Sequence, residues 1–127
     1  MKDKALLGSR LLFGLAFVIF GLNGFFNFMA NPPMAPEAGA LMGAFAKTGY
    51  FFPMVKIVEI VAGALLLSGF FVPFALALIF PILIGITSIH LFLNPGGLPI
   101  MIVFHLLHGF LVYGYWKNFK SVMVVKA

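Results

Sequence analysis

Two charged residues, Lys56 and Glu59, lie inside one of the most apolar stretches of the chain, PMVKIVEIVAG. Residues three apart share one face of a helix, so the ammonium and the carboxylate can pair. If the stretch crosses a membrane, each charge would cost about 2.5 to 3.5 kcal/mol facing lipid, and such a residue is by default a functional candidate. We therefore expect both charges to face the protein interior.

Other polar residues recur at helical spacing in three further apolar stretches: Asn23 with Asn27, Thr87 with His90, and His105 with His108. At 1.5 Å per residue, the candidates lie roughly 6 to 15 Å from the helix ends nearest the segment 31–50 or the turn NPGGLP. All then fall in one half of a hydrocarbon core about 30 Å thick. This common depth predicts one shared polar chamber. Its candidate residues are Asn23, Lys56, Glu59, His90, His105 and His108.

A quinone headgroup suits such a chamber, because it needs hydrogen-bond donors, apolar walls and a route for protons. Histidine donates hydrogen bonds and carries protons near neutral pH. Burial disfavours the charged form of Glu59 while Lys56 favours it, and this opposition suits proton exchange. A Phe-lined chamber could admit an isoprenoid tail sideways from the bilayer. Lipids or sterol-like molecules could use the same chamber.

Each candidate also has a structural interpretation. The Lys56–Glu59 pair could only fix helix packing, or Lys56 could extend to the interface. The histidines could make structural hydrogen bonds, and Asn23 could join two helices. A further alternative is a metal or haem site, because carboxylate and imidazole suit Zn or Fe. The Glu-x-x-His units of di-iron bundles are missing, however.

Composition places these residues in a membrane protein. The chain has 127 residues, of which 63% are hydrophobic and only 9% charged, whereas soluble domains carry about 25% charged residues. No Asp, Glu, Lys or Arg occurs between Glu59 and Lys117, a run more than twice the roughly 20 residues of one span. Cysteine is absent, which excludes disulfides and thiolate ligands within the chain. The net charge of +5 lies mostly at the two ends and does not indicate nucleic-acid binding.

We expect an all-α integral membrane four-helix bundle that forms one transmembrane domain, residues 1–127. The predicted spans are 8–30, 51–69, 72–93 and 98–116, separated by the turn-forming motifs NPPMAP, SGFFVP and NPGGLP. The first span is expected to be retained, because its apolar run exceeds that of a signal peptide. Between spans one and two, Pro36, Glu37, Lys47 and Gly49 predict a short interfacial helix.

Basic residues flank the first and last spans, whereas the segment 31–50 contains only Lys47. The positive-inside rule therefore predicts both termini in the cytoplasm. The flanking residues are Lys2, Lys4, Arg10, Lys117, Lys120 and Lys126.

The chain resembles the DoxX family of small four-helix bacterial membrane proteins. The resemblance covers nearly the whole chain, and its most telling parts are Glu59 in VEIVAGALLL and His90 in HLFLNPGGLP. It implies a subunit of the bacterial inner membrane that is linked to quinone redox chemistry, with Glu59 and His90 as the catalytic residues. No flavin or Fe–S motif is present, so electrons would come from a redox partner protein and the chain would not be a self-contained enzyme.

Two interpretations remain open. In the first, the chain is a quinone-interacting subunit of a membrane oxidoreductase, in which His105 and His108 assist, Asn23 orients the ligand and Lys56 tunes Glu59. In the second, it is a non-catalytic protein that binds a lipid or a partner's transmembrane helix and assists assembly. The expected partners are the lipid bilayer, a redox protein in the first case, and copies of the chain itself.

Overall fold

The structure, a computed structural model, describes residues 2–29 and 34–125. Its described part is all-α, with four helices long and apolar enough to cross a membrane. The elements are α1 (Lys2–Phe26), α2 (Pro36–Lys47), α3 (Phe51–Ser68), α4 (Val72–Phe92), the 3₁₀ turn η1 (Pro95–Gly97), α5 (Leu98–Gly114) and α6 (Trp116–Phe119). The predicted four-helix bundle with a short helix after the first span is confirmed.

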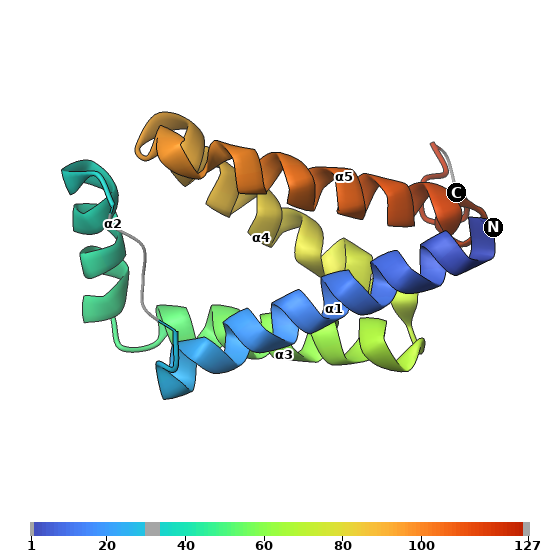
Figure 1. Cartoon of the computed structure of the whole chain (residues 1–127), viewed down its shortest axis with the longest axis horizontal. Coiled ribbons are helices and arrows are strands. Elements are labelled where there is room, and N and C mark those ends of the chain that lie inside the picture. Colours follow the sequence, from blue (N-terminus) through green and yellow to red (C-terminus); the bar gives the residue numbers. More distant parts are fainter. Residues whose placement is uncertain (1, 30–33, 126–127) are drawn as a thin grey trace.

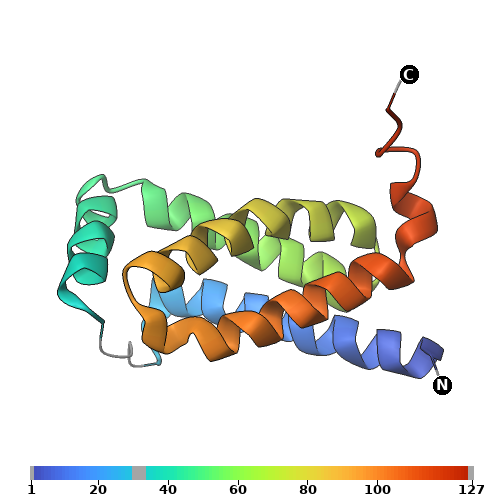
Figure 2. The ribbon, with the colours of Figure 1, turned by 90° about the horizontal axis from the view of Figure 1, so that it is seen from above.

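The four long helices run side by side and alternate in direction, and α2 lies across one end of the bundle (Figures 1 and 2). The beginning of α1 and the short α6 lie at the opposite end (Figure 1). Helix α1 packs most extensively on α3, and the ring closes through α4 and α5. Toward α2, the α4–α5 pair diverges from the α1–α3 pair (Figure 1).

Helix α1 differs most from its predicted span, 8–30. It begins at Lys2 and ends at Phe26, four residues before Ala30, which lies outside the described residues together with Lys126. The helix ends where it does because Asn27 takes a left-handed conformation, with φ at 51°. The other three spans agree with the predicted bounds within about two residues at each end.

Helices α1 and α3 approach closely because glycines face each other at their crossing. A Cβ on Gly63 would lie 2.7 Å from the carbonyl oxygen of Gly14, and one on Gly14 would lie 2.9 Å from that of Gly63. Small residues at helix contacts let backbones pack closely in a membrane, where van der Waals contact drives association. This crossing fixes the rotation of α3 and therefore the direction in which Glu59 points.

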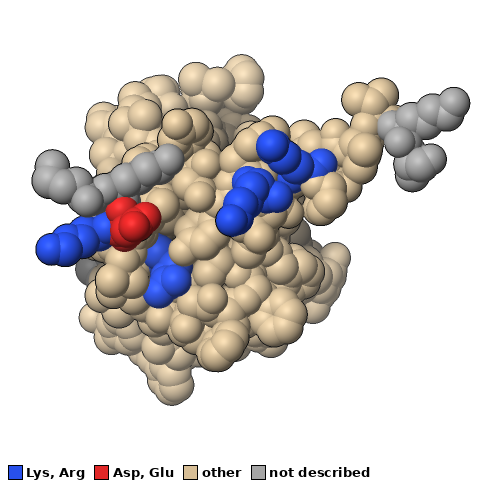
Figure 3. All heavy atoms as spheres, turned by 90° about the vertical axis from the view of Figure 1, so that its right-hand side faces the viewer, with Lys and Arg blue, Asp and Glu red and all other residues tan. Residues whose placement is uncertain are grey.

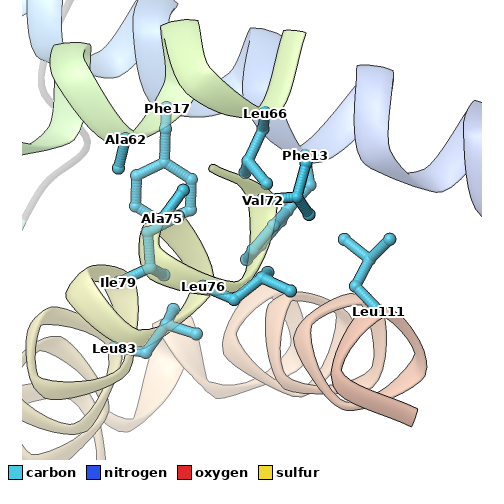
Figure 4. Close-up of a cluster of buried hydrophobic side chains, with 10 residues drawn as sticks. All are labelled: Phe13, Phe17, Ala62, Leu66, Val72, Ala75, Leu76, Ile79, Leu83 and Leu111. Atoms are coloured by element: carbon cyan, nitrogen blue, oxygen red, sulfur yellow. The ribbon is translucent and has the colours of Figure 1, made fainter. Parts of the chain in front are cut away.

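A cluster of buried apolar side chains joins all four long helices (Figure 4). Phe13 and Phe17 of α1 meet edge to face at 5.0 Å between ring centroids. Leu76 of α4 and Leu111 of α5 are fully buried beside them. The cluster comprises Phe13, Phe17, Ala62, Leu66, Val72, Ala75, Leu76, Ile79, Leu83 and Leu111.

Candidate functional site

A cavity of about 550 Å³ lies between α2, α3 and α4, at the end of the bundle away from the chain termini. Its walls are almost entirely apolar, with aromatic and aliphatic side chains from all three helices. Among the residues that the structure describes, Lys56 and Glu59 are the only charged ones that line it. The lining also includes Phe45 of α2, Phe52 of α3 and Ile86 of α4. An apolar pocket with few polar groups is typical of a small-molecule site.

Lys56 and Glu59 form an ion pair in the wall of this cavity, with Nζ 3.4 Å from Oε2. Glu59 is 3% exposed and lies on the buried stripe of α3, one turn before Ala62 and Gly63. It is therefore held by the same face of α3 that packs on α1. The sequence prediction that the ammonium and the carboxylate pair is confirmed by this contact.

Helix α1 supports Lys56 from behind through a glycine. A Cβ on Gly24 would lie 2.5 Å from Cγ of Lys56 and 2.7 Å from its Cδ, so the lysine stem runs over the bare glycine backbone. Gly21, one turn earlier, faces the backbone of α3, and a Cβ there would lie 3.1 Å from the carbonyl oxygen of Lys56. Lys56 consequently lies along α1 toward Glu59, with about a quarter of its side chain exposed.

Helix α2 closes one side of the cavity through an aromatic contact. The rings of Phe45 and Phe51 stack with their centroids 4.1 Å apart. Gly49, with φ at 77°, makes the sharp turn that brings α2 back over α3. At the other end of α2, the backbone N–H of Ala35 donates to Oδ1 of Asn94, in the turn after α4, at 3.3 Å.

Asn23 does not line the cavity. Its Oδ1 accepts a hydrogen bond from the backbone N–H of Met29 at 2.7 Å, and its carbonyl oxygen accepts one from Asn27 at 2.9 Å. Asn23 therefore organises the end of α1. The ligand-orienting role expected from its depth receives no support from this arrangement.

His108 lies in the packed middle of the bundle and not at the cavity. It is 8% exposed, and its Nε2 lies 2.9 Å from the carbonyl oxygen of Leu76. Because a carbonyl oxygen can only accept, Nε2 carries the proton and donates it. Leu76 is next to Ala77, whose carbonyl loses its helical donor because Pro81 has no N–H. His108 thus binds α5 to α4 where proline weakens the helix.

His105 and His90 also contact other parts of the bundle and not the cavity. Nε2 of His105 lies 2.7 Å from Oγ1 of Thr87 and shares a hydrogen bond with it, which joins α5 to α4. The His90 ring packs against Gly97 so closely that a Cβ there would overlap it. Nδ1 of His90 is buried without a hydrogen-bond partner among the described residues. Neither histidine lines the cavity.

The six candidate residues that were predicted to share one chamber therefore do not all lie around one cavity. Two of the six candidates, Lys56 and Glu59, line the cavity, and the other four do not. Within residues 2–29 and 34–125, no three metal-ligating side chains gather, so the metal alternative lacks a ligand set there. The expected depths follow from helix rise alone, whereas a shared chamber also requires matching rotations of the helices about their axes.

Sequence reasoning missed the residues that open the cavity on α4. Pro81, Gly85 and Ser88 line it and are exposed on the molecular surface. A Cβ on Gly85 would meet no atom within 4 Å, so α4 leaves open space at this point. The available signal was the spacing of Pro81, Gly85 and Ser88, which places three small or rigid residues on one face of α4.

Comparison with known proteins gives no match: no family model, curated protein or solved structure matches the chain.

Proposed function

We propose that the cavity binds the headgroup of a quinone and that the chain serves as a quinone-interacting subunit of a bacterial membrane oxidoreductase. The single observation that carries this proposal is the position of Lys56 and Glu59 in an otherwise apolar cavity of about 550 Å³. The ammonium can donate to a quinone carbonyl, and the carboxylate can exchange protons. The resemblance to the DoxX family supports the same assignment.

The open side of the cavity supports a ligand that arrives from the bilayer. Gly85, Ser88 and Met54 line the cavity and are exposed at the outer surface of the helices. Four membrane-spanning helices would place this opening against lipid. An isoprenoid tail can then remain among acyl chains while the headgroup reaches Lys56.

Reduction of the bound quinone to a quinol takes two electrons and two protons. Both electrons would come from the redox group of a partner oxidoreductase, since the chain has no cysteine to ligate a cluster or form a dithiol. Protons would pass to the two quinone oxygens through the Lys56–Glu59 pair and water. His90, His105 and His108 do not line the cavity, so their part in this step is to support the bundle.

For orientation, we propose that the basic end, where α1 begins, faces the cytoplasm. Lysine and arginine side chains gather on this end of the molecule (Figure 3). The positive-inside rule assigns such an end to the cytoplasmic side. The cavity would then lie in the outer half of the inner membrane.

A second candidate function is non-catalytic binding of a lipid or of a partner helix during assembly. The observation that favours it is the engagement of His105 and His108 with Thr87 and Leu76, which leaves the cavity with one ion pair and no histidine. An apolar cavity with one ion pair also suits a phospholipid.

Mass spectrometry of lipids that copurify with the protein tests both functions. We expect quinone to be enriched with the wild type and lost from Glu59→Gln. Glu37→Gln is the matched control, because Glu37 is exposed on α2 and does not line the cavity. Retention of phospholipid without quinone by the wild type would instead favour the second function. Equal quinone in the wild type and Glu59→Gln would contradict the assignment of Glu59.

A further inference from the structure

Arg10 lies at the opposite end of the bundle from the cavity, wedged between three helix ends. A Cβ on Gly69, in the turn between α3 and α4, would lie only 2.9 Å from Nη1 of Arg10. The same nitrogen lies 3.4 Å from the hydroxyl oxygen of Tyr115, which follows α5. Gly69 and Tyr115 mark the ends of their helices, so the guanidinium lies at the level where the spans meet the membrane interface.

The guanidinium is poorly satisfied by the rest of the described chain. It has five N–H donors. The bond to Tyr115 is long, and Nε is buried without a hydrogen-bond partner. In the described residues the only ion pair joins Lys56 to Glu59, so Arg10 has no carboxylate partner there. A cation at a membrane interface without such a partner is a ready site for an external anion.

The surroundings of Arg10 carry further positive charge. Lys4 of α1, Lys117 of α6 and Lys120, directly after α6, are exposed at this end, and Asp3 is the only acidic residue there. Figure 3 shows lysine and arginine side chains in separate groups on this end of the molecule, with one small acidic patch beside them. Each basic residue near an anionic leaflet adds to the electrostatic attraction between them. Trp116, also exposed here, is a residue type enriched at the lipid headgroup level.

We propose that Arg10 and Tyr115 bind the phosphate group of an anionic phospholipid from the leaflet next to the chain termini. The planar guanidinium can hold two phosphate oxygens at once, and the Tyr115 hydroxyl can donate to the same group. Gly69 leaves room for this arrangement, because a Cβ there would lie 2.9 Å from Nη1 and the guanidinium would have to shift. The three lysines attract the anionic leaflet without selecting one phosphate. This site is independent of the cavity and of its ligand.

Native mass spectrometry of the full chain, released from nanodiscs of phosphatidylcholine doped with phosphatidylglycerol, tests the proposal. We expect the wild type to retain one phosphatidylglycerol, and Arg10→Met to bind it about tenfold more weakly. Arg10→Lys should fall between the two, because it keeps the charge and loses the planar fork. The matched control is Lys120→Gln, which removes one charge from the same end and should change retention less than about twofold.

Three results would overturn the proposal. Unchanged retention by Arg10→Met would remove Arg10 from the site, and an equal loss in Lys120→Gln would show diffuse attraction only. Displacement of the lipid by inorganic phosphate at near-physiological concentration would identify a free anion as the ligand. If Arg10→Met does not fold, lipid retention is compared between Arg10→Lys and Lys120→Gln. A loss in Arg10→Lys no larger than in Lys120→Gln would then overturn the proposal. A rise in the wild-type melting temperature on adding phosphatidylglycerol, absent in Arg10→Lys, would support the proposal.

Discussion

The two ends of the bundle are built differently. From the middle toward the chain termini, apolar side chains of all four long helices interlock in a packed cluster (Figure 4). Under α2, the α4–α5 pair diverges from the α1–α3 pair (Figure 1), and α2, α3 and α4 enclose a cavity of about 550 Å³ with one ion pair in its wall. Helix α4 belongs to both regions, since Leu83 is fully buried in the cluster and Ile86, three residues on, lines the cavity.

This difference indicates how a small helical protein can combine a packed region with a cavity. Association of helices in lipid depends on van der Waals contact and hydrogen bonds rather than on a hydrophobic driving force. The glycine crossing of α1 on α3 and the His108 bond to Leu76 supply such contacts at the packed end. The other end can therefore diverge and leave room for a ligand. We therefore expect substitutions at the packed end to change mainly the stability and substitutions at the cavity end to change mainly ligand binding.

The largest effect should come from the glycine crossing. Gly63→Leu would drive a side chain into the Gly14 carbonyl and into Val18, so we expect the free energy of unfolding to fall by about 3 kcal/mol. Gly85→Leu is the matched control, because a Cβ there meets no atom within 4 Å. It should change stability by less than about 1 kcal/mol and instead obstruct the cavity opening. Unfolding in mixed micelles, followed by circular dichroism, measures the stability of both variants. Equal losses of stability would contradict the assignment of stability to the packed end.

Next in size is the loss of a packed side chain from α4. Leu83→Ala leaves a void in the cluster, and we expect it to cost about 2 kcal/mol. Ile86→Ala enlarges a cavity that already exists, so it should cost about 1 kcal/mol or less. The same unfolding titration compares the two variants. A larger loss for Ile86→Ala would show that the cavity end is packed in the membrane.

Substitutions of Lys56 and Glu59 should have non-additive effects on the free energy of unfolding, because the two side chains form an ion pair. Lys56→Met leaves the buried Glu59 carboxylate unpaired, and we expect a loss of about 2 kcal/mol. Glu59→Gln should cost less, because Lys56 is partly exposed and its ammonium can reach polar surroundings. The double variant should be more stable than Lys56→Met alone. A double-mutant cycle measures this coupling, and additive losses would show that the two charges act independently.

The smallest effect is expected from the hydrogen bond between α4 and α5. Thr87→Val removes the hydroxyl that shares a hydrogen bond with Nε2 of His105 at 2.7 Å. Side-chain hydrogen bonds between membrane helices contribute about 0.6 kcal/mol on average, and we expect a loss of that size. Retention of the cavity ligand should not change, because neither residue lines the cavity. If Thr87→Val loses the ligand, His105 takes part in ligand binding.

The sequence by itself determined the number of spans, their approximate bounds and the short helix after the first span. Apolar length decides whether a segment can cross a membrane, and Pro, Gly and Asn mark its ends locally. The spacing of Lys56 and Glu59 also predicted an ion pair, because residues three apart on a helix are neighbours whatever surrounds them.

Tertiary structure alone decided which polar residues share a space. Helix rise fixes the depth of a residue, but the direction of its side chain depends on rotation about the helix axis, and packing sets that rotation. The contact of Gly14 with Gly63 turns Glu59 into the bundle and toward the cavity. His108 lies at a comparable predicted depth, yet its helix turns it toward the Leu76 carbonyl. The spacing of residues in the sequence therefore gives the depth of a side chain but not the direction in which it points.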